Sequence, residues 1–410
     1  MIHVCFAQYD ANGRYSKFTG TAMCSLFENH FSAPTLPSVT VHILHDNTLT
    51  KDNREKFIYL AGSYGQCVKF YNVDELCAAE IAEIRGLFPT AAKTRYSIGM
   101  FYRFFIPQVL SPDIGKAIYL DSDTIVNLDI SELWRVNLEN KPLGAIDELH
   151  ITSDPLHSAQ DKYLVKNNLV AYEDYFNSGV LFLNLDYWRN NNDFVKEGFR
   201  FVAAHPEMTY IDQDILNYLF AKNHVKLSEK FDTFIDKARK NLQICPAIYH
   251  YFGDTLQINL DEPFNRLWLD YFTKTPWFDI GTIDNFKNYV LKSGGDFLDK
   301  MKKFSALLSG KTRAFVVTPE QSEQVKKDFF IRDDEEIIIV EKDTMSQELI
   351  DKIKAERDKK IFFGFVADFP ETLNKAGLIE NEDFFNGFLF YPDVYYYFTL
   401  GNGHRIIKEM

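Results

Sequence analysis

The sequence predicts an α/β protein in two parts, a large domain built on a mostly parallel sheet and a small C-terminal α/β domain. The chain of 410 residues is long for one domain. Apolar, β-branched runs alternate with helical stretches up to about residue 130, which is typical of a parallel sheet. A composition shift over residues 291–311, with paired glycines and a basic amphipathic stretch, precedes a second set of strand-like runs. We therefore expect domains at 1–280 and 311–410, joined by a helical linker at 281–310.

The first strand is predicted over residues 2–8, where Ile2, Val4 and Phe6 share one face at period two. The pattern then predicts a helix over 17–30, a strand over 39–46, a helix over 51–61 that Thr50 caps, a strand over 67–73, a helix over 94–110 and a strand over 117–120. In parallel sheets, ligands bind beyond the carboxyl ends of the strands. The expected site therefore lies where the first strand ends near residues 8–10 and the fourth ends at Asp121.

The rest of the chain has a looser pattern. It predicts a buried strand or hairpin over 175–185, an amphipathic helix over 210–220 and a strand end over 247–253. Three further strand-like runs, over 313–318, 335–341 and 360–367, belong to the small C-terminal domain. We find no internal repeat and no low-complexity segment.

Charge and cysteine content exclude several classes of protein. The formal net charge is −13 and there is no basic block, so we expect no nucleic-acid partner. No run approaches the roughly 18 apolar residues of a membrane span, so no transmembrane segment is expected. The five cysteines are scattered without C-x-x-C spacing, and Cys5 and Cys67 fall in strands predicted to be buried. This usage favours a reducing, cytoplasmic location and argues against a zinc site.

The stretch AIYLDSDTIV, residues 117–126, places two carboxylates at the end of a buried strand. Uncompensated negative charge at such a place is costly. Asp121 and Asp123 are suited to a hard divalent cation, which can also bridge a nucleotide diphosphate. Taken alone, the pair more often marks a turn at Asp121 followed by a helix that Asp123 caps.

Four motifs together resemble glycosyltransferase family 8. Residues 119–138 resemble its D-x-D region, and matches to its further motifs follow in the family's order at 175–185, 212–217 and 250–253. The resemblance covers roughly residues 1–275 and includes lipopolysaccharide α-galactosyltransferases and glycosyltransferases of serine-rich streptococcal adhesins. It implies a single Rossmann-like nucleotide-sugar-binding domain with a mixed, mostly parallel sheet. It also implies a UDP-sugar donor and Mn²⁺, with Mg²⁺ as the alternative cation.

The resemblance also assigns roles to residues. Metal ligands would be Asp121, Asp123 and His250. Donor contacts would be Ala7, Tyr9 and Asp10 at the uridine, Arg103 near the sugar and phosphates, Ser122 in the D-x-D motif, Asn177 and Asp212 at the sugar hydroxyls, and Gly253. Gln213 and Asp214 would be catalytic. Taken singly, His250 could be a hydrogen-bonded strand-end histidine, Arg103 the partner of an acid, and Asn177 a turn residue. Asp212 and Asp214 could complement a helix dipole.

The resemblance implies that the anomeric configuration is retained. Gln213 stands where a nucleophile would be needed, and an amide is a poor nucleophile, so we expect the acceptor to attack from the face that UDP leaves. One feature departs from the family, because Leu256, Gln257 and Ile258 replace its usual Lys-Pro-Trp. Lys226, Arg266 or Lys274 would then have to supply the cation near the leaving diphosphate.

We therefore expect a retaining hexosyltransferase with UDP-galactose favoured as donor and UDP-glucose next. The acceptor would be a bacterial surface glycan or a glycosylated protein. A non-catalytic nucleotide-sugar or carbohydrate-binding module is one alternative. The other is a Mg²⁺-dependent phosphatase-like hydrolase with a D-x-D motif. That pattern prefers Thr or Val four positions after the first Asp, where this chain has Ile125.

Overall fold

The computed structural model describes the chain except residues 12, 14, 31–36, 89–96, 192, 242, 253–261, 286, 289–290, 293–294, 296–309, 330, 342–344 and 391–410, and the side chains of 193–194 and 389–390. Contacts divide the described chain into one compact unit within residues 1–284 and a second that begins at residue 285. The predicted linker over 281–310 falls largely outside the described residues, so its boundaries stay a prediction.

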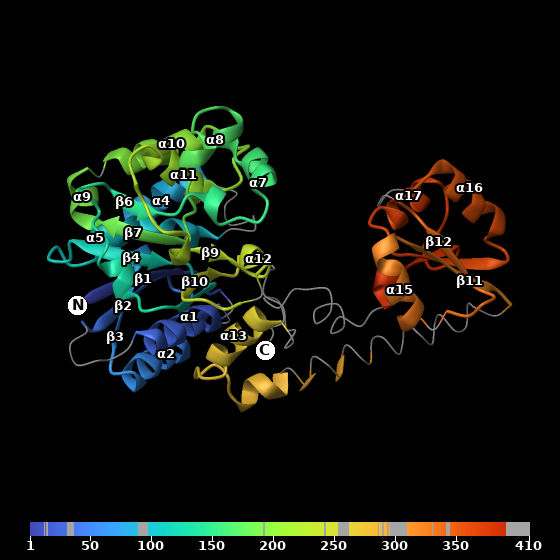
Figure 1. Ribbon diagram of the computed structural model, residues 1–410, viewed down its shortest axis with the longest axis horizontal. Helices are drawn as coiled ribbons and strands as arrows, with labels where there is room; N and C mark the ends of the chain where they lie inside the picture. The colour runs from blue at the N-terminus through green and yellow to red at the C-terminus, as the bar shows by residue number, and fades with distance from the viewer. Residues whose placement is uncertain are drawn as a thin grey trace. The chain divides into compact units, whose positions relative to one another are not determined.

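Seven strands form the main sheet of the first unit, in the order β3-β2-β1-β4-β7-β6-β8 (Figure 1). Their bounds are β1 Ile2–Gln8, β2 Val39–His45, β3 Cys67–Asn72, β4 Lys116–Leu120, β6 Leu143–Ala145, β7 Val180–Asn184 and β8 Val225–Lys226. Strands β3, β2, β1 and β4 are parallel, as are β6 and β8, whereas β7 is antiparallel to β4 and β6. The predicted mixed, mostly parallel sheet is confirmed.

Helices cover both faces of this sheet (Figure 1). Ile2, Val4 and Phe6 pack into one core with α1, α2 and α13, and Cys5 packs into a second core with η2, α10 and α11. The helices of the first unit are α1 Ser16–Asn29, α2 Lys51–Ser63, α3 Val73–Leu76, α4 Ala78–Leu87, η2 Ile98–Phe105, α5 Ile106–Val109, α6 Ser131–Trp134, η3 Glu148–His150, α7 Pro155–Asp161, α8 Tyr163–Lys166, η4 Tyr172–Asp174, α9 Leu185–Asn190, α10 Asp193–Ala203, α11 Ile211–Phe220, η5 Glu229–Phe231, α12 Ile235–Ala238 and α13 Pro263–Phe272. None of the helices in the described part of the chain has the length and apolar character that a membrane span needs.

A second, three-stranded sheet lies at the carboxyl end of β4 and brings distant segments together. It consists of β5 Thr124–Asn127, β10 Ala247–His250 and β9 Thr233–Phe234. Strand β10 is antiparallel to β5, with His250 opposite Thr124, and parallel to β9. The backbone N–H of Tyr251 donates to the carbonyl oxygen of Asp123 at 2.8 Å. This pairing fixes His250 beside the loop that carries Asp121 and Asp123.

The second unit contains a four-stranded parallel sheet in the order β12-β11-β13-β14. Its elements are β11 Thr312–Val317, α15 Pro319–Asp328, β12 Glu336–Ile339, α16 Gln347–Glu356, β13 Lys360–Gly364, α17 Phe369–Lys375, β14 Phe384–Asn386 and η6 Gly387–Phe390. The three strands predicted here are present. The fourth strand, β14, was not expected, because its pairing residues are too few to produce a period in the sequence.

Two local predictions are wrong. The helix predicted over 94–110 is, where described, a 3₁₀ helix over Ile98–Phe105 followed by the short α5. Pro107 lies in the first turn of α5, where its missing N–H breaks no bond, so the segment divides there. Cys67 is exposed, because it begins the edge strand β3 and the buried face there belongs to alternate residues.

Two helical glycines offer a matched test of the packing. A Cβ on Gly20 in α1 would lie 2.2 Å from the Cζ3 atom of Trp277, whereas a Cβ on Gly62 in α2 would meet nothing within 4 Å. We expect Gly20→Ala to destabilise the first unit by about 1–3 kcal/mol through overpacking. Gly62→Ala should stabilise it by about 0.5–1 kcal/mol. All four tryptophans lie between residues 134 and 277, so urea unfolding followed by tryptophan fluorescence reports on this unit. Equal effects of the two variants would contradict the packing.

Candidate active site

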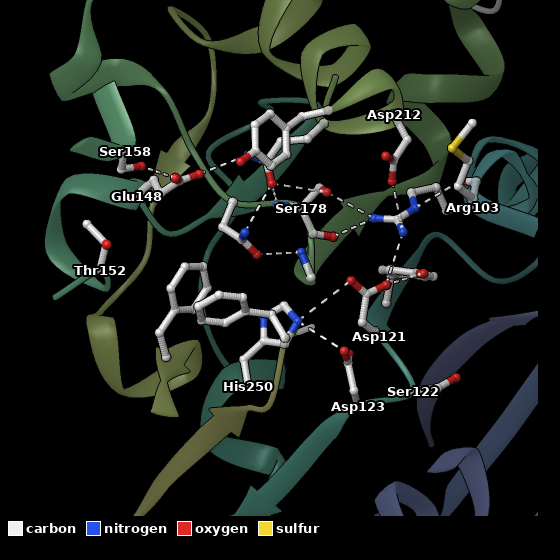
Figure 2. Close-up of a pocket in the computed structure, with 18 of the residues that line it drawn as sticks. Arg103, Asp121, Ser122, Asp123, Glu148, Thr152, Ser158, Ser178, Asp212 and His250 are labelled. Atoms are coloured by element: carbon white, nitrogen blue, oxygen red, sulfur yellow. Dashed lines mark hydrogen bonds and ion pairs between the residues drawn. The ribbon is translucent and has the colours of Figure 1, made fainter. Parts of the chain in front are cut away.

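A cavity of about 980 Å³ lies at the carboxyl ends of β1, β4 and β10 (Figure 2). Most of the residues predicted for donor and metal binding line it: Ala7, Tyr9, Arg103, Asp121, Ser122, Asp123, Asn177, Asp212, Gln213 and His250. The cavity therefore collects residues from widely separated motifs at the place where a parallel sheet binds ligands.

Three of the predicted residues are not among the described residues that line the cavity. Asp10 is buried and accepts hydrogen bonds from the backbone N–H of Tyr15 at 2.6 Å and from Asn53 Nδ2 at 3.0 Å. Asp214 is fully buried and accepts from the Tyr175 hydroxyl at 2.8 Å. Neither Asp10 nor Asp214 is among the described residues that line the cavity, and the roles predicted for them stay predictions. Gly253 lies outside the described residues.

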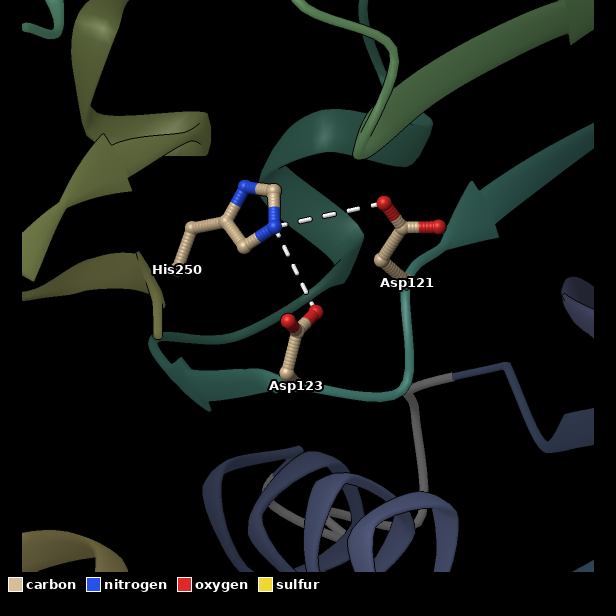
Figure 3. A group of neighbouring side chains, drawn as sticks. All are labelled: Asp121, Asp123 and His250. Atoms are coloured by element: carbon tan, nitrogen blue, oxygen red, sulfur yellow. Dashed lines mark ion pairs between the residues drawn. The ribbon is translucent and has the colours of Figure 1, made fainter. Parts of the chain in front are cut away.

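Asp121, Asp123 and His250 form a group with the composition of a metal site (Figure 3). The two aspartates occupy the turn between β4 and β5, and His250 ends β10. His250 Nε2 lies 3.3 Å from Asp123 Oδ1 and 3.9 Å from Asp121 Oδ2. One ligand atom from each residue lies within 4.8 Å of the others. Two carboxylate oxygens and one imidazole nitrogen are donors that suit Mn²⁺. Because Asp123 is followed by strand β5, the alternative of a helix cap at Asp123 is excluded.

Negative charge accumulates at this group. Burial raises the pKa of Asp121 to about 6; Arg103 lowers it in opposition, and Asp123 raises it further. Asp121 Oδ1 accepts from Tyr119 Oη at 2.6 Å and from Arg103 Nη2 at 3.0 Å. Arg103 Nη2 also lies 3.0 Å from Asp212 Oδ2. One oxygen of Asp121 is therefore bound by the protein, and the other faces His250.

The imidazole of His250 is held from several sides. Its Nδ1 lies 3.1 Å from Asp232 Oδ1, and this bond directs Nε2 toward the two aspartates. A Cβ on Gly179 would lie 2.2 Å from the Cε1 atom of His250, so the ring occupies space that only a glycine leaves. Burial lowers the pKa of His250, but the carboxylates of Asp232 and Asp123 raise it well above its ordinary value. Metal-binding histidines commonly have such a carboxylate behind them.

The side-chain amide of Gln213 is fixed by hydrogen bonds at both ends. Its Oε1 accepts from Asn177 Nδ2 at 3.0 Å and from the backbone N–H of Ser178 at 3.1 Å. Its Nε2 donates to Glu148 Oε2 at 2.8 Å and to the Tyr175 hydroxyl at 3.3 Å. This pattern distinguishes the oxygen from the nitrogen and leaves the amide one orientation.

The residues of the site that were not predicted from the sequence include Tyr119, Glu148, Lys162 and Asp232. Glu148 shares the signal that marked Asp121, because it follows the buried strand β6 after two residues. Lys162 and Asp232 stand in stretches without any such pattern. Lys162 lines the cavity, whereas the cations proposed from the sequence do not. Lys226 pairs with Asp147 and Asp174, and Lys274 pairs with Glu28. Arg266 is an exposed residue of α13.

Comparisons with known proteins agree with this geometry. The profile of the family described as glycosyl transferase family 8 matches residues 6–255. General stress protein A of Bacillus subtilis is 23% identical over 295 residues, which cover 66% of this chain and 94% of that protein. A lipopolysaccharide 1,2-glucosyltransferase of Escherichia coli is 23% identical over 277 residues, covering 66% of this chain and 76% of that one. The crystal structure of galactosyltransferase LgtC with donor and acceptor sugar analogues superposes with a TM-score of 0.50 at 21% identity, covering 67% of this chain and 96% of that one, and so shares the fold.

Removal of the Asp232 carboxylate should weaken metal binding, because His250 loses the partner that orients its ring. We expect Asp232→Ala to raise the dissociation constant of Mn²⁺ about 10- to 100-fold, measured by isothermal titration calorimetry. Asp232→Asn, which keeps an oxygen for the Nδ1–H, should show a smaller loss. Asp52→Asn, an exposed carboxylate of α2, is the control. Unchanged affinity in Asp232→Ala would show that Asp232 does not position His250.

Asp214 should make the first unit less stable as the pH rises. Burial raises its pKa to about 7 from an ordinary 3.8, although the Tyr175 hydroxyl lowers it in opposition. Between these values the folded state holds a proton that the unfolded state has lost, so the free energy of unfolding falls with increasing pH. In chelator, Asp214→Asn should reduce the difference in unfolding free energy between pH 5 and pH 8 by up to about 3 kcal/mol. Asp52→Asn should keep the wild-type difference, and an unchanged difference in Asp214→Asn would contradict the assignment.

Proposed function

The chain belongs to glycosyl transferase family 8, and on that premise we propose that it transfers a hexose from a UDP-sugar to a glycan with retention of anomeric configuration. The observation that carries the proposal is the convergence of Asp121, Asp123 and His250 at one end of the cavity that Arg103, Asp212 and Gln213 also line. These side chains offer a place for a metal, for a diphosphate and for sugar hydroxyls within one enclosed space.

The donor would lie across the ends of β1 and β4. Ala7 and Tyr9 line the end of the cavity beside β1, where the uridine would bind. Arg103 lies between Asp121 and Asp212, with its Nη2 3.0 Å from each carboxylate. From there it can face the diphosphate while it keeps Asp212 oriented toward the sugar. Asn177, adjacent to Gln213, would contact a further hydroxyl.

Asp121, Asp123 and His250 would hold Mn²⁺, or Mg²⁺ as the alternative. When bound, the ion supplies Lewis-acid stabilisation of the negative charge that develops on the departing diphosphate. Asp232 keeps Nε2 of His250 available as a ligand. Tyr119 and Arg103 hold Oδ1 of Asp121, which would leave Oδ2, on the side of His250, as the ligand atom.

The fixed amide of Gln213 supports attack from the face that UDP leaves. A double displacement needs a carboxylate nucleophile at the anomeric carbon. Asp214 does not line the cavity, and Asp212 is paired with Arg103. Gln213 is an amide whose oxygen already accepts two hydrogen bonds. We therefore propose a same-face mechanism in which the Gln213 oxygen lies near the developing positive charge at the sugar.

Galactose is the favoured donor sugar and glucose the next. The chain is similar both to a galactosyltransferase of known structure and to a curated glucosyltransferase, and the two sugars differ at one hydroxyl. The proposed acceptor is a bacterial surface glycan or a glycosylated protein. A cytoplasmic location is part of the proposal, because all five cysteines are free thiols and three of them are buried.

Release of UDP tests the proposal against its alternatives. We expect UDP release from UDP-galactose or UDP-glucose in the presence of Mn²⁺, and a loss of at least about 100-fold in Asp123→Asn, because a metal ligand is removed. Asp52→Asn should keep the wild-type rate. Binding of a UDP-sugar without UDP release would indicate a non-catalytic binding module. Release of inorganic phosphate from phosphomonoesters would indicate the phosphatase-like hydrolase.

A further inference from the structure

The cavity extends past the residues assigned to the donor. Figure 2 shows Glu148, Thr152 and Ser158 gathered in one part of it, away from Asp121 and Asp123. This part, here called the second half, is formed by η3, α7, residues that flank these two helices, and the more distant Tyr210 and Asp236. The side chains used below are Glu148, Asp154, Asp161, Lys162, Tyr210 and Asp236, all of which line the cavity.

The second half begins at the amide of Gln213. Glu148 Oε2 accepts from Gln213 Nε2 at 2.8 Å. Glu148 Oε1 accepts from the Ser158 hydroxyl and lies 3.0 Å from Lys162 Nζ. A ligand in the second half would therefore lie next to Gln213, the residue proposed to face the reacting sugar carbon.

The described lining of the second half carries more negative than positive charge. It contains four carboxylates, those of Glu148, Asp154, Asp161 and Asp236, and one ammonium, that of Lys162. It also contains the imidazole of His157, whose Nε2 lies 3.5 Å from Asp161 Oδ2. The Lys162 ammonium already has partners within the protein, because it pairs with Glu148 and lies 3.3 Å from the centre of the Tyr210 ring. Lys237 and Lys240 donate to the backbone carbonyls of His150 and Ser153 and are not among the lining residues.

These carboxylates keep capacity for further hydrogen bonds. Asp154 Oδ1 accepts from the backbone N–H of His157 at 3.1 Å, and Asp236 Oδ2 accepts from that of Ser153 at 3.2 Å. An ionised carboxylate accepts about four hydrogen bonds and donates none. A ligand that satisfies such a wall must bring donors, as sugar hydroxyls do. An ionised carboxylate or phosphate group on the ligand accepts hydrogen bonds from donors, of which this wall has few, and is repelled by like charge.

We propose that the second half binds the acceptor, and that it selects an uncharged, hydroxyl-rich sugar against acceptors bearing carboxylate or phosphate. This inference rests on the proposed function and narrows its substrate class. Asp154, Asp161 and Asp236 are the specificity-determining residues. Uronic acids and sugar phosphates are the acceptors they exclude.

Matched pairs of acceptors test the selection. Alkyl glucoside is compared with alkyl glucuronide, and alkyl galactoside with alkyl galacturonide, since each pair differs only at C6, where a carboxylate replaces the hydroxymethyl group. With Mn²⁺ and the better UDP-hexose, we expect kcat/KM to be at least about tenfold higher for the neutral member. Higher ionic strength should narrow the gap, because the repulsion is screened. The double variant Asp154→Asn/Asp161→Asn should reduce the ratio of kcat/KM between the neutral and the charged acceptor about threefold or more. Asparagine at position 154 still caps α7, and Asp52→Asn should leave the gap unchanged.

The outcomes distinguish a failure of this inference from a failure of the proposed function. UDP release without acceptor reports on donor chemistry alone. If UDP is released but a uronide is used as well as its neutral partner, or no neutral glycoside is used at all, the inference is overturned. A gap that is the same in Asp154→Asn/Asp161→Asn as in the wild type would also overturn it. Absence of UDP release from every UDP-hexose would instead refute the proposed function.

Discussion

The hydrogen bond from the Tyr251 backbone N–H to the Asp123 carbonyl, at 2.8 Å, belongs to the strand pairing on which the site depends. Through it, β10 aligns antiparallel to β5 and delivers His250 to the turn that carries both aspartates. Residues far apart in the sequence thereby meet within ligand distance. A shift of one residue in this pairing would turn the His250 side chain to the opposite face of the strand. Its imidazole would then no longer lie beside the carboxylates of Asp121 and Asp123. The candidate metal site is thus a consequence of strand register.

The same strand register brings several carboxylates close together, and neighbouring cationic and hydrogen-bonding side chains contact them. Arg103 lies between Asp121 and Asp212, Tyr119 donates to Asp121, and His250 lies between Asp123 and Asp232. Burial raises the pKa of Asp121 to about 6, against the opposing effect of Arg103 and with a further contribution from Asp123. A divalent cation at this place would offset the excess of negative charge. The strand pairing that gathers the carboxylates would therefore also form the metal site that the proposed chemistry needs.

Much of this could be predicted from the sequence, for identifiable reasons. The period-two pattern of Ile2, Val4 and Phe6 predicted a strand with these residues on one face, and in the fold they share one core. The D-x-D motif predicted a strand end because its approach is apolar. Asp232 and Lys162 could not be predicted, because their roles arise from the tertiary contacts with His250 and Glu148. Asp10 and Asp214 look like site residues in the sequence, yet both carboxylates accept hydrogen bonds in the interior and neither residue is among the described lining of the cavity.

Pulsed electron paramagnetic resonance of the protein with Mn²⁺ and UDP tests the central claim most directly, because it detects the nuclei bound to the ion. The proposed site predicts a ¹⁴N coupling from the imidazole of His250 and a ³¹P coupling from the diphosphate in the same spectrum. The ¹⁴N coupling should disappear in His250→Ala. A spectrum of the wild-type protein with neither coupling, or a ¹⁴N coupling that persists in His250→Ala, would contradict it.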